Sequence, residues 1–179
     1  MAKMAKAGKQ ATVQHNSSGR RLHSSIGLKT ETKSTMIELL NRRLADSFDL
    51  YSQLKQAHWS VRGMHFIALH ELFDSLAAEF LGYGDELAER IAALGGYAFG
   101  TVRQAGLHSS LPEYPVSALS GEDHVVALVE RVAMFANLTR DSIEAAEEDT
   151  VTADLLTEIA RAADKHLWFL EAHMPKGKA

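Results

Sequence analysis

Histidine and carboxylate side chains recur at helical spacing between residues 58 and 89 of this 179-residue chain. His70 and Asp74 are four residues apart, as are Asp85 and Glu89, so each pair would lie on one face of a helix. The chain has no cysteine, which excludes disulfides, thiolate metal sites and iron-sulfur clusters. Imidazole and carboxylate groups suit Fe(II) and also Zn(II). The pattern therefore predicts a metal site built from His, Asp and Glu.

His58 belongs to the same group of residues, although it precedes a short break at Arg62 and Gly63 that His70 follows. An antiparallel hairpin at this break would bring the two imidazoles to similar heights. His70 and Asp85, however, are 15 residues apart, which is roughly 22 Å along a straight helix, whereas a ligand atom lies about 2 Å from its metal ion. One chain cannot close such a site. The spacing favours a ligand set shared by two chains that a two-fold axis relates.

Long amphipathic helices are expected to carry these residues. Apolar residues recur at steps of three and four after a capping-box spacing at Thr35, and they predict a first helix of about 27 residues. A second helix, of about 31 residues, is expected to end before Gly95 and Gly96. Ser120 is the expected cap of a third helix that runs toward Glu148. A fourth helix is expected over residues 151–174.

Residues 97–119 contain Gly, Ser and two of the three prolines, and they predict a long connection with a short helix of its own. We see no strand-like alternation and no internal repeat. Four long helices with a long connection between the second and third are typical of an all-α, ferritin-like four-helix bundle.

Charge divides the chain. Residues 1–34 carry a net charge of +6 and few large apolar residues, so we expect a mobile basic N-terminal tail. Residues 35–175 carry −12 and are the expected bundle, and residues 176–179 are a short basic C-terminal tail. Neither a secretory signal nor a membrane span is visible, so we expect a cytoplasmic protein that also associates with the nucleoid.

The residues of the predicted metal site resemble those of the Dps proteins, the DNA-binding proteins from starved cells, also called miniferritins. The shared pattern is His-Trp, a His twelve residues later, an Asp fifteen further on and a Glu four beyond, here His58-Trp59, His70, Asp85 and Glu89. The stretches AHWSVRGMHFIALHELFD and AERIAALGG are similar to family signatures. Weaker similarity extends over about residues 35–173.

This resemblance implies a hollow dodecamer with an iron-oxidising centre at each two-fold interface. Its ligands would be His58, His70 and Asp74 of one subunit with Asp85 and Glu89 of its mate. Dps proteins typically oxidise Fe(II) with hydrogen peroxide and store the ferric mineral inside. Zn(II) is the expected competitor, since ligand type alone does not choose the metal.

The sequence contains further candidates around this centre. Trp59 is a candidate sink for a stray oxidising equivalent, and an aromatic that packs at an interface is the alternative. The resemblance places iron-entry pores at the junction of the third and fourth helices, where four acidic residues gather: Glu147, Glu148, Asp149 and Asp154. Ordinary helix capping and surface charge are the alternative reading of these residues.

The basic tail is the predicted site for sequence-independent, salt-sensitive DNA binding. Its candidate residues are Lys3, Lys6, Lys9, Arg20, Arg21, Lys29 and Lys33. The expected function is therefore a ferroxidase and iron store that also binds and protects DNA. The alternative is a structural, nucleoid-compacting DNA-binding protein whose iron site is vestigial.

Overall fold

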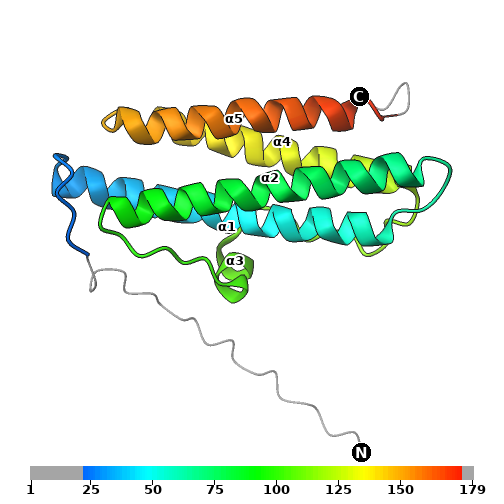
Figure 1. The fold of residues 1–179 in the computed structure, drawn as a ribbon, viewed down its shortest axis with the longest axis horizontal. Coiled ribbons are helices and arrows are strands. Elements are labelled where there is room, and N and C mark those ends of the chain that lie inside the picture. Colours follow the sequence, from blue (N-terminus) through cyan, green and yellow to red (C-terminus); the bar gives the residue numbers. More distant parts are fainter. Residues whose placement is uncertain (1–21, 175–179) are drawn as a thin grey trace, which may run out of the picture.

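The structure is a computed structural model that describes residues 22–174, and these residues form five α-helices (Figure 1). They are α1 (Thr30–Ser60), α2 (Phe66–Ala93), α3 (Val102–His108), α4 (Gly121–Ala145) and α5 (Thr150–Glu171). The four long helices lie side by side, and the connection that contains α3 returns along the bundle from the end of α2 to the start of α4 (Figure 1). Residues 22–174 contain no strand. The predicted all-α bundle with a long connection between its second and third long helices is confirmed.

Each long helix contributes an apolar stripe to one shared core. Leu44 and Leu54 of α1 are fully buried, and Phe80 of α2 packs edge-on against Phe135 of α4 with ring centroids 5.1 Å apart. Burial of these stripes drives the helices together. Among the helices of residues 22–174, none has the length and hydropathy of a membrane-spanning segment.

The first helix begins five residues before the predicted start at Thr35. α1 starts at Thr30, and Lys29 precedes it in an extended conformation without a side-chain cap. The Thr35 hydroxyl donates to the carbonyl of Glu31 from inside the helix, a bond that Thr makes when it lies within a helix. The predicted helix start is therefore wrong, and residues 30–34 of the expected tail are helical. Residues 1–21 and 175–179 lie outside the described part of the chain.

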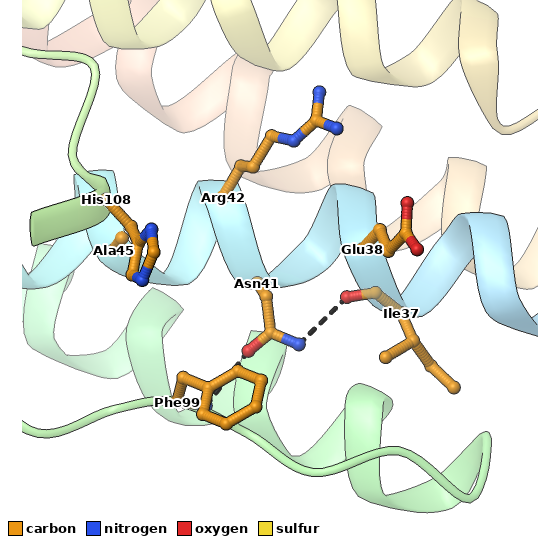
Figure 2. Close-up of a pocket in the computed structure, with 7 residues that line it drawn as sticks. All are labelled: Ile37, Glu38, Asn41, Arg42, Ala45, Phe99 and His108. Atoms are coloured by element: carbon orange, nitrogen blue, oxygen red, sulfur yellow. Dashed lines mark hydrogen bonds between the residues drawn. The ribbon is translucent and has the colours of Figure 1, made fainter. Parts of the chain in front are cut away.

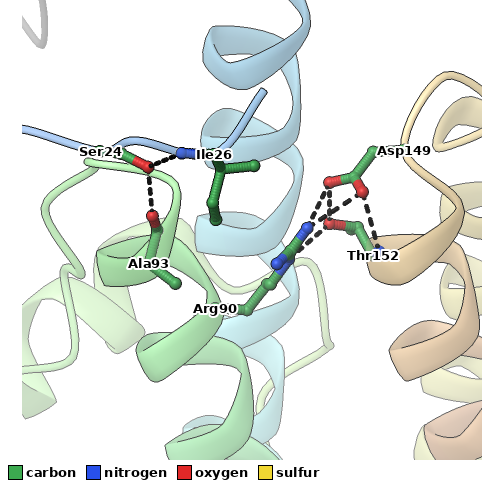
Figure 3. A network of polar contacts seen from close by, with 6 residues as sticks. All are labelled: Ser24, Ile26, Arg90, Ala93, Asp149 and Thr152. Carbon is green, nitrogen blue, oxygen red and sulfur yellow. Dashed lines mark hydrogen bonds and ion pairs between the residues drawn. The ribbon is translucent and has the colours of Figure 1, made fainter. Parts of the chain in front are cut away.

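Residues 22–29 pack against the C-terminal end of α2. The Leu22 N–H donates to the carbonyl of Gly95 at 2.9 Å, and the Ser24 hydroxyl donates to the carbonyl of Ala93 at 2.6 Å (Figure 3). Gly95 has φ +84°, and a Cβ there would lie 2.6 Å from the Leu22 carbonyl oxygen. The predicted stop at Gly95 is confirmed, because only glycine combines this backbone conformation with such a close approach.

Buried polar side chains fasten the long connection to α1 and α4. Asp46 accepts a hydrogen bond from the Ser110 N–H at 2.6 Å. Arg131, which is 4% exposed, donates to Gln53 Oε1 at 2.7 Å and to the carbonyl of Glu113 at 2.5 Å. A buried charge without such partners is strongly destabilising. These bonds therefore hold the connection along the bundle.

Caps define the remaining helix ends. The Ser120 side chain accepts from the Asp123 N–H at 3.1 Å and the Asp123 carboxylate accepts from the Ser120 N–H at 3.0 Å, so the predicted cap of the third long helix is confirmed. α4 ends at Ala145, somewhat before the predicted end near Glu148. The carboxylate of Asp149 caps α5.

Replacing Gly95 with alanine is expected to lower the free energy of unfolding by about 1–3 kcal/mol, because alanine disfavours a positive φ and its Cβ would meet Leu22. Gly106→Ala is the matched control. Nothing lies within 4 Å of a Cβ at Gly106 in α3, so this change should raise the free energy of unfolding by about 1 kcal/mol. Thermal unfolding at one protein concentration measures both variants. Equal stability of the two would contradict the prediction.

Candidate metal centre

His58 and His70 lie face to face where α1 ends and α2 begins. Their ring centroids are 3.7 Å apart and the ring planes differ by 21°. His58 Nδ1 lies 2.8 Å from the carbonyl oxygen of His70, and His70 Nδ1 lies 2.8 Å from the carbonyl oxygen of His58. A carbonyl oxygen only accepts, so each Nδ1 donates its N–H. Each Nε2 therefore keeps a lone pair that can bind a metal ion.

The end of α1 explains why the ring of His70 bonds to the carbonyl of His58. The last four carbonyl groups of a helix lack a partner within the helix, and the carbonyl of His58 is one of them because α1 ends at Ser60. The ring of His70 satisfies that carbonyl and is oriented by it. The two imidazoles thus meet across the hairpin as the sequence predicts, in orientations that the backbone sets.

Asp74 lies beside this pair and is bound by a lysine. Its carboxylate accepts a 2.5 Å hydrogen bond from Lys55 Nζ, which lowers the pKa of the Asp74 carboxyl, and the nearby His58 and His70 lower that pKa further. The ionised carboxylate can bind a cation, which would compete with Lys55 for Oδ1. Lys55 was not predicted, although its place three residues before His58 on the same face of α1 is a signal for it.

Asp85 and Glu89 are exposed on α2, one turn apart and far from the histidines. α2 is continuous from Phe66 to Ala93, so Asp85 lies roughly 22 Å from His70 along the helix. Within residues 22–174, no group of three or more His, Asp or Glu side chains is placed to hold a metal ion. A single chain therefore presents two partial sets of predicted ligands, one toward each end of α2.

Two of the pockets on the described residues adjoin α1 and the long connection. One of about 380 Å³ opens between α1 and the long connection, where the Asn41 side chain donates to the carbonyl of Ile37 and accepts from the Phe99 N–H (Figure 2). No predicted site residue lines it. A second pocket, of about 430 Å³, is lined in part by Lys55 and Trp59 and so adjoins the histidine pair.

Comparison with known proteins identifies the family. Residues 37–179 match the model of the ferritin-like domain family. A DNA protection during starvation protein from Agrobacterium fabrum is 42% identical over 149 residues, which cover 82% of this chain and 92% of that protein. The chain belongs to the Dps family. Its predicted family resemblance is therefore confirmed.

Solved Dps structures share the fold of this chain. The tetragonal form of Mycobacterium smegmatis Dps superposes with a TM-score of 0.82 at 34% identity, over 87% of this chain and 94% of that one. Dps from Microbacterium arborescens in the high iron form gives 0.76 at 34% identity, over 81% and 95%. These likenesses confirm the ferritin-like bundle.

Trp59 of this Dps chain lies on the surface next to His58. Its side chain is 68% exposed, and Lys55 Nζ lies 5.8 Å from its ring centroid. An exposed indole suits a subunit contact as well as a redox role. The role of radical sink stays a prediction.

Asp149, one of the four predicted pore residues of this Dps chain, is buried. It is 3% exposed and forms an ion pair with Arg90 of α2 at 2.7 Å. Its carboxylate also accepts a 2.5 Å hydrogen bond from the Thr152 hydroxyl (Figure 3). Its carboxylate thus caps α5 and ties this helix to α2. Helix capping was the alternative reading of Asp149 and is confirmed, whereas the ion pair was not predicted, because Arg90 is 59 residues away in sequence.

The other three acidic residues of that group are exposed: Glu147, Glu148 and Asp154. Glu148 accepts a 2.7 Å hydrogen bond from the Thr32 hydroxyl of α1. Their role at an iron-entry pore stays a prediction.

Two of the seven basic residues predicted to bind DNA lie in the described part of the chain. Lys29 is exposed just before α1. Lys33 Nζ donates to the carbonyl of Ser24 at 3.1 Å and so holds residues 22–29 on the bundle. The other five lie outside the described residues: Lys3, Lys6, Lys9, Arg20 and Arg21.

Replacing Asp149 with alanine is expected to lower the free energy of unfolding by about 2–5 kcal/mol, because it uncaps α5 and leaves the largely buried Arg90 without its anion. Glu147→Ala removes an exposed carboxylate two residues away and is the matched control, with a change within about 0.5 kcal/mol. Chemical denaturation at pH 7 measures the difference. A loss no larger than that of the control would contradict the assignment.

The same variant should show a defined pH dependence. Burial raises the pKa of Asp149, but hydrogen bonds from Thr152 and Arg90 outweigh burial and leave the pKa below its usual value of 3.8. Such a carboxyl stabilises the fold above its unfolded-state pKa and loses this contribution as the pH falls through the folded-state pKa. The stability gap between the parent and Asp149→Ala should therefore be constant above about pH 5 and shrink below about pH 4. A gap that widens on acidification would argue against the ion pair.

Proposed function

We propose that this chain oxidises Fe(II) as its substrate and stores the ferric product, at centres that form between two subunits. The observation that carries the proposal is the His58 and His70 pair, in which both Nδ1 atoms are satisfied and both Nε2 atoms are available. Asp74 adds an ionised carboxylate beside them. Nitrogen and oxygen ligands of this type suit Fe(II), and they would also hold Zn(II) as a competitor.

Residue spacing along α2 supports a partner helix that completes the centre. Two α2 helices that pair antiparallel about an axis between residues 79 and 80 would place His70 opposite Glu89 and Asp74 opposite Asp85. His70 and Glu89 have the same mean residue number as Asp74 and Asp85, so a single two-fold axis brings the residues of both pairs opposite each other. The exposed Leu81 lies on the same stripe of α2 as the two aspartates and is available for this contact.

Exposed apolar side chains support subunit contact near the histidines. Large apolar side chains are exposed around the end of α1 and the start of α2: Trp59, Met64, Phe66 and Ile67. Clusters of this kind on a folded chain mark contact surfaces. We infer a homo-oligomer, and the family resemblance extends this inference to a hollow dodecamer whose interior receives the mineral.

Hydrogen peroxide is the proposed oxidant. Two Fe(II) ions supply two electrons to one peroxide, which takes up two protons and becomes two waters, so no hydroxyl radical is released. Asp74, Asp85 and Glu89 offset the charge of the cations, and a cation at Asp74 competes with the ammonium group of Lys55 for that carboxylate.

Mixed oligomers test whether the centre is shared between subunits. A subunit that lacks both histidines (His58→Ala, His70→Ala) and one that lacks both carboxylates (Asp85→Asn, Glu89→Gln) should each oxidise Fe(II) more than about tenfold more slowly than the parent. When the two variants are refolded together, half of the randomly formed subunit pairs contain one subunit of each kind, and one of the two sites in each such pair is complete. About a quarter of the parent activity should therefore return. Ferric absorbance after peroxide addition measures the rate.

The control is a mixture of the two variant oligomers that are assembled separately and then combined without refolding. No recovery in co-refolded oligomers that have normal size would contradict a shared centre. Full parent rates in both separate variants would instead favour a structural DNA-compacting protein with a vestigial iron site.

We further propose that residues 1–21 bind DNA without sequence preference. Five basic residues fall in this stretch, and Lys29 continues the positive charge up to α1, whereas residues 35–175 carry a net charge of −12 and would repel phosphates. Several such tails on one oligomer would bind DNA together, and each phosphate contact adds to the salt dependence.

Deleting residues 1–21 is expected to abolish the gel shift of duplex DNA at about 50 mM salt, because the deletion removes the basic stretch and leaves the packed residues 22–29 in place. A variant of full length with Lys3, Lys6, Lys9, Arg20 and Arg21 replaced by Gln separates charge from length. The parent shift should also weaken steeply by about 200 mM salt. A shift that survives the deletion would place DNA binding elsewhere on the protein.

A further inference from the structure

A tyrosine, a glutamate and a buried histidine meet between α2 and α5, apart from the histidine pair. The Tyr83 hydroxyl donates to Glu79 Oε2 at 3.1 Å, and the same carboxylate oxygen lies 2.9 Å from His166 Nε2. The Tyr83 oxygen is also 3.4 Å from His166 Nε2. One carboxylate oxygen therefore serves both a phenol and an imidazole.

The surroundings of His166 define the hydrogen bonding of this group. His166 is 2% exposed, and its Nδ1 is buried without a hydrogen-bond partner among the described residues. Its Nε2 faces the carboxylate of Glu79, so Nε2 is the nitrogen that carries the proton and donates. This bond positions the Glu79 carboxylate as an acceptor next to the phenol.

Aromatic rings enclose the bundle side of the phenol. Phe80 packs edge-on against Tyr83 with centroids 5.6 Å apart, and it also contacts His166 at 5.8 Å. The phenol is thus held in one orientation, with its hydroxyl at a carboxylate and its ring in an apolar setting. A tyrosine placed in this way can lose an electron and a proton together.

We propose that Tyr83 is a redox-active tyrosine that reduces strong one-electron oxidants, with Glu79 as the acceptor of its proton. The inference rests on the proposed function, since iron and peroxide together generate oxidants of the hydroxyl-radical class whenever a single Fe(II) reacts. It assigns to this chain a second, protective activity beside two-electron iron oxidation.

The step balances in electrons and protons. The oxidant accepts one electron from the phenol and becomes hydroxide, which solvent protonates to water, while the phenolic proton passes to Glu79 along the existing hydrogen bond. A later Fe(II) returns one electron to the tyrosyl oxygen and becomes Fe(III). The proton then moves back from Glu79, and the resting phenol is restored.

The place of Tyr83 on α2 suits this role. It precedes Asp85 by two residues, which places the two side chains on nearly opposite faces of one helix. An electron that Fe(II) at Asp85 returns to the tyrosyl oxygen therefore crosses the width of a helix, about 10–12 Å. Trp59 is mostly exposed beside the other partial ligand set, so Trp59 and Tyr83 would meet oxidants at different places on the protein.

Electron paramagnetic resonance on the assembled, full-length protein tests the proposal. Samples frozen after Fe(II) and hydrogen peroxide are mixed should show a tyrosyl signal, and Tyr83→Phe should lose it while the ring packing is kept. Tyr97→Phe, which changes an exposed tyrosine of the long connection, is the matched control and should retain the signal. Glu79→Gln still accepts a hydrogen bond but is not a base, so its tyrosyl signal should be weaker than that of the parent.

A second arm needs no iron. Azide radicals generated by pulse radiolysis in iron-free protein should give a long-lived tyrosyl absorbance that Tyr83→Phe loses and Tyr97→Phe retains. A tyrosyl signal that does not depend on Tyr83 in either arm would overturn the proposal, even if Tyr83→Phe lowers the unfolding temperature, because the contact would then be structural. Failure to oxidise iron would overturn the proposed function alone, and the radiolysis arm would still decide the role of Tyr83.

Discussion

A straight helix sets the distances between its own residues, and in this chain that constraint falls on α2. The helix runs without a break from Phe66 to Ala93, so the imidazole of His70 and the carboxylate of Asp85 cannot approach one another within one chain. Chemistry that needs both groups requires a second subunit. The rigidity of α2 therefore couples the proposed reaction to assembly, because a monomer holds three of the five predicted ligands near the start of α2 and the other two near its end.

Each end of α2 is held by a different kind of contact. At its start, two imidazoles exchange hydrogen bonds with backbone carbonyls, which orients them without using the nitrogens that a metal ion needs. At its end, Arg90 bonds to the carboxylate of Asp149, and the backbone of Gly95 bonds to that of Leu22. Both ends are thus tied to other segments of the chain, which keeps the ligand spacing constant.

The periodicity of the sequence was sufficient to predict the four long helices and the spacing of the candidate ligands along α2, because a helix converts residue number directly into position. Periodicity did not determine the start of α1 or the contacts between residues that are far apart in sequence. The capping-box spacing at Thr35 gave a wrong start for α1, since a helix that begins at Thr30 includes the same residues. The partners of Asp74 and Asp149, which are Lys55 and Arg90, come from other helices. Local spacing alone does not reveal such pairs.

The order of the elements has a consequence for synthesis. All five predicted ligands lie between residues 58 and 89, in the hairpin of α1 and α2, and α4 and α5 follow only after the long connection. A hairpin depends on contacts between neighbouring segments and can close early in folding. Because domains emerge from the ribosome N-terminus first, the growing polypeptide bears all five predicted ligands before the second half of the bundle has been translated.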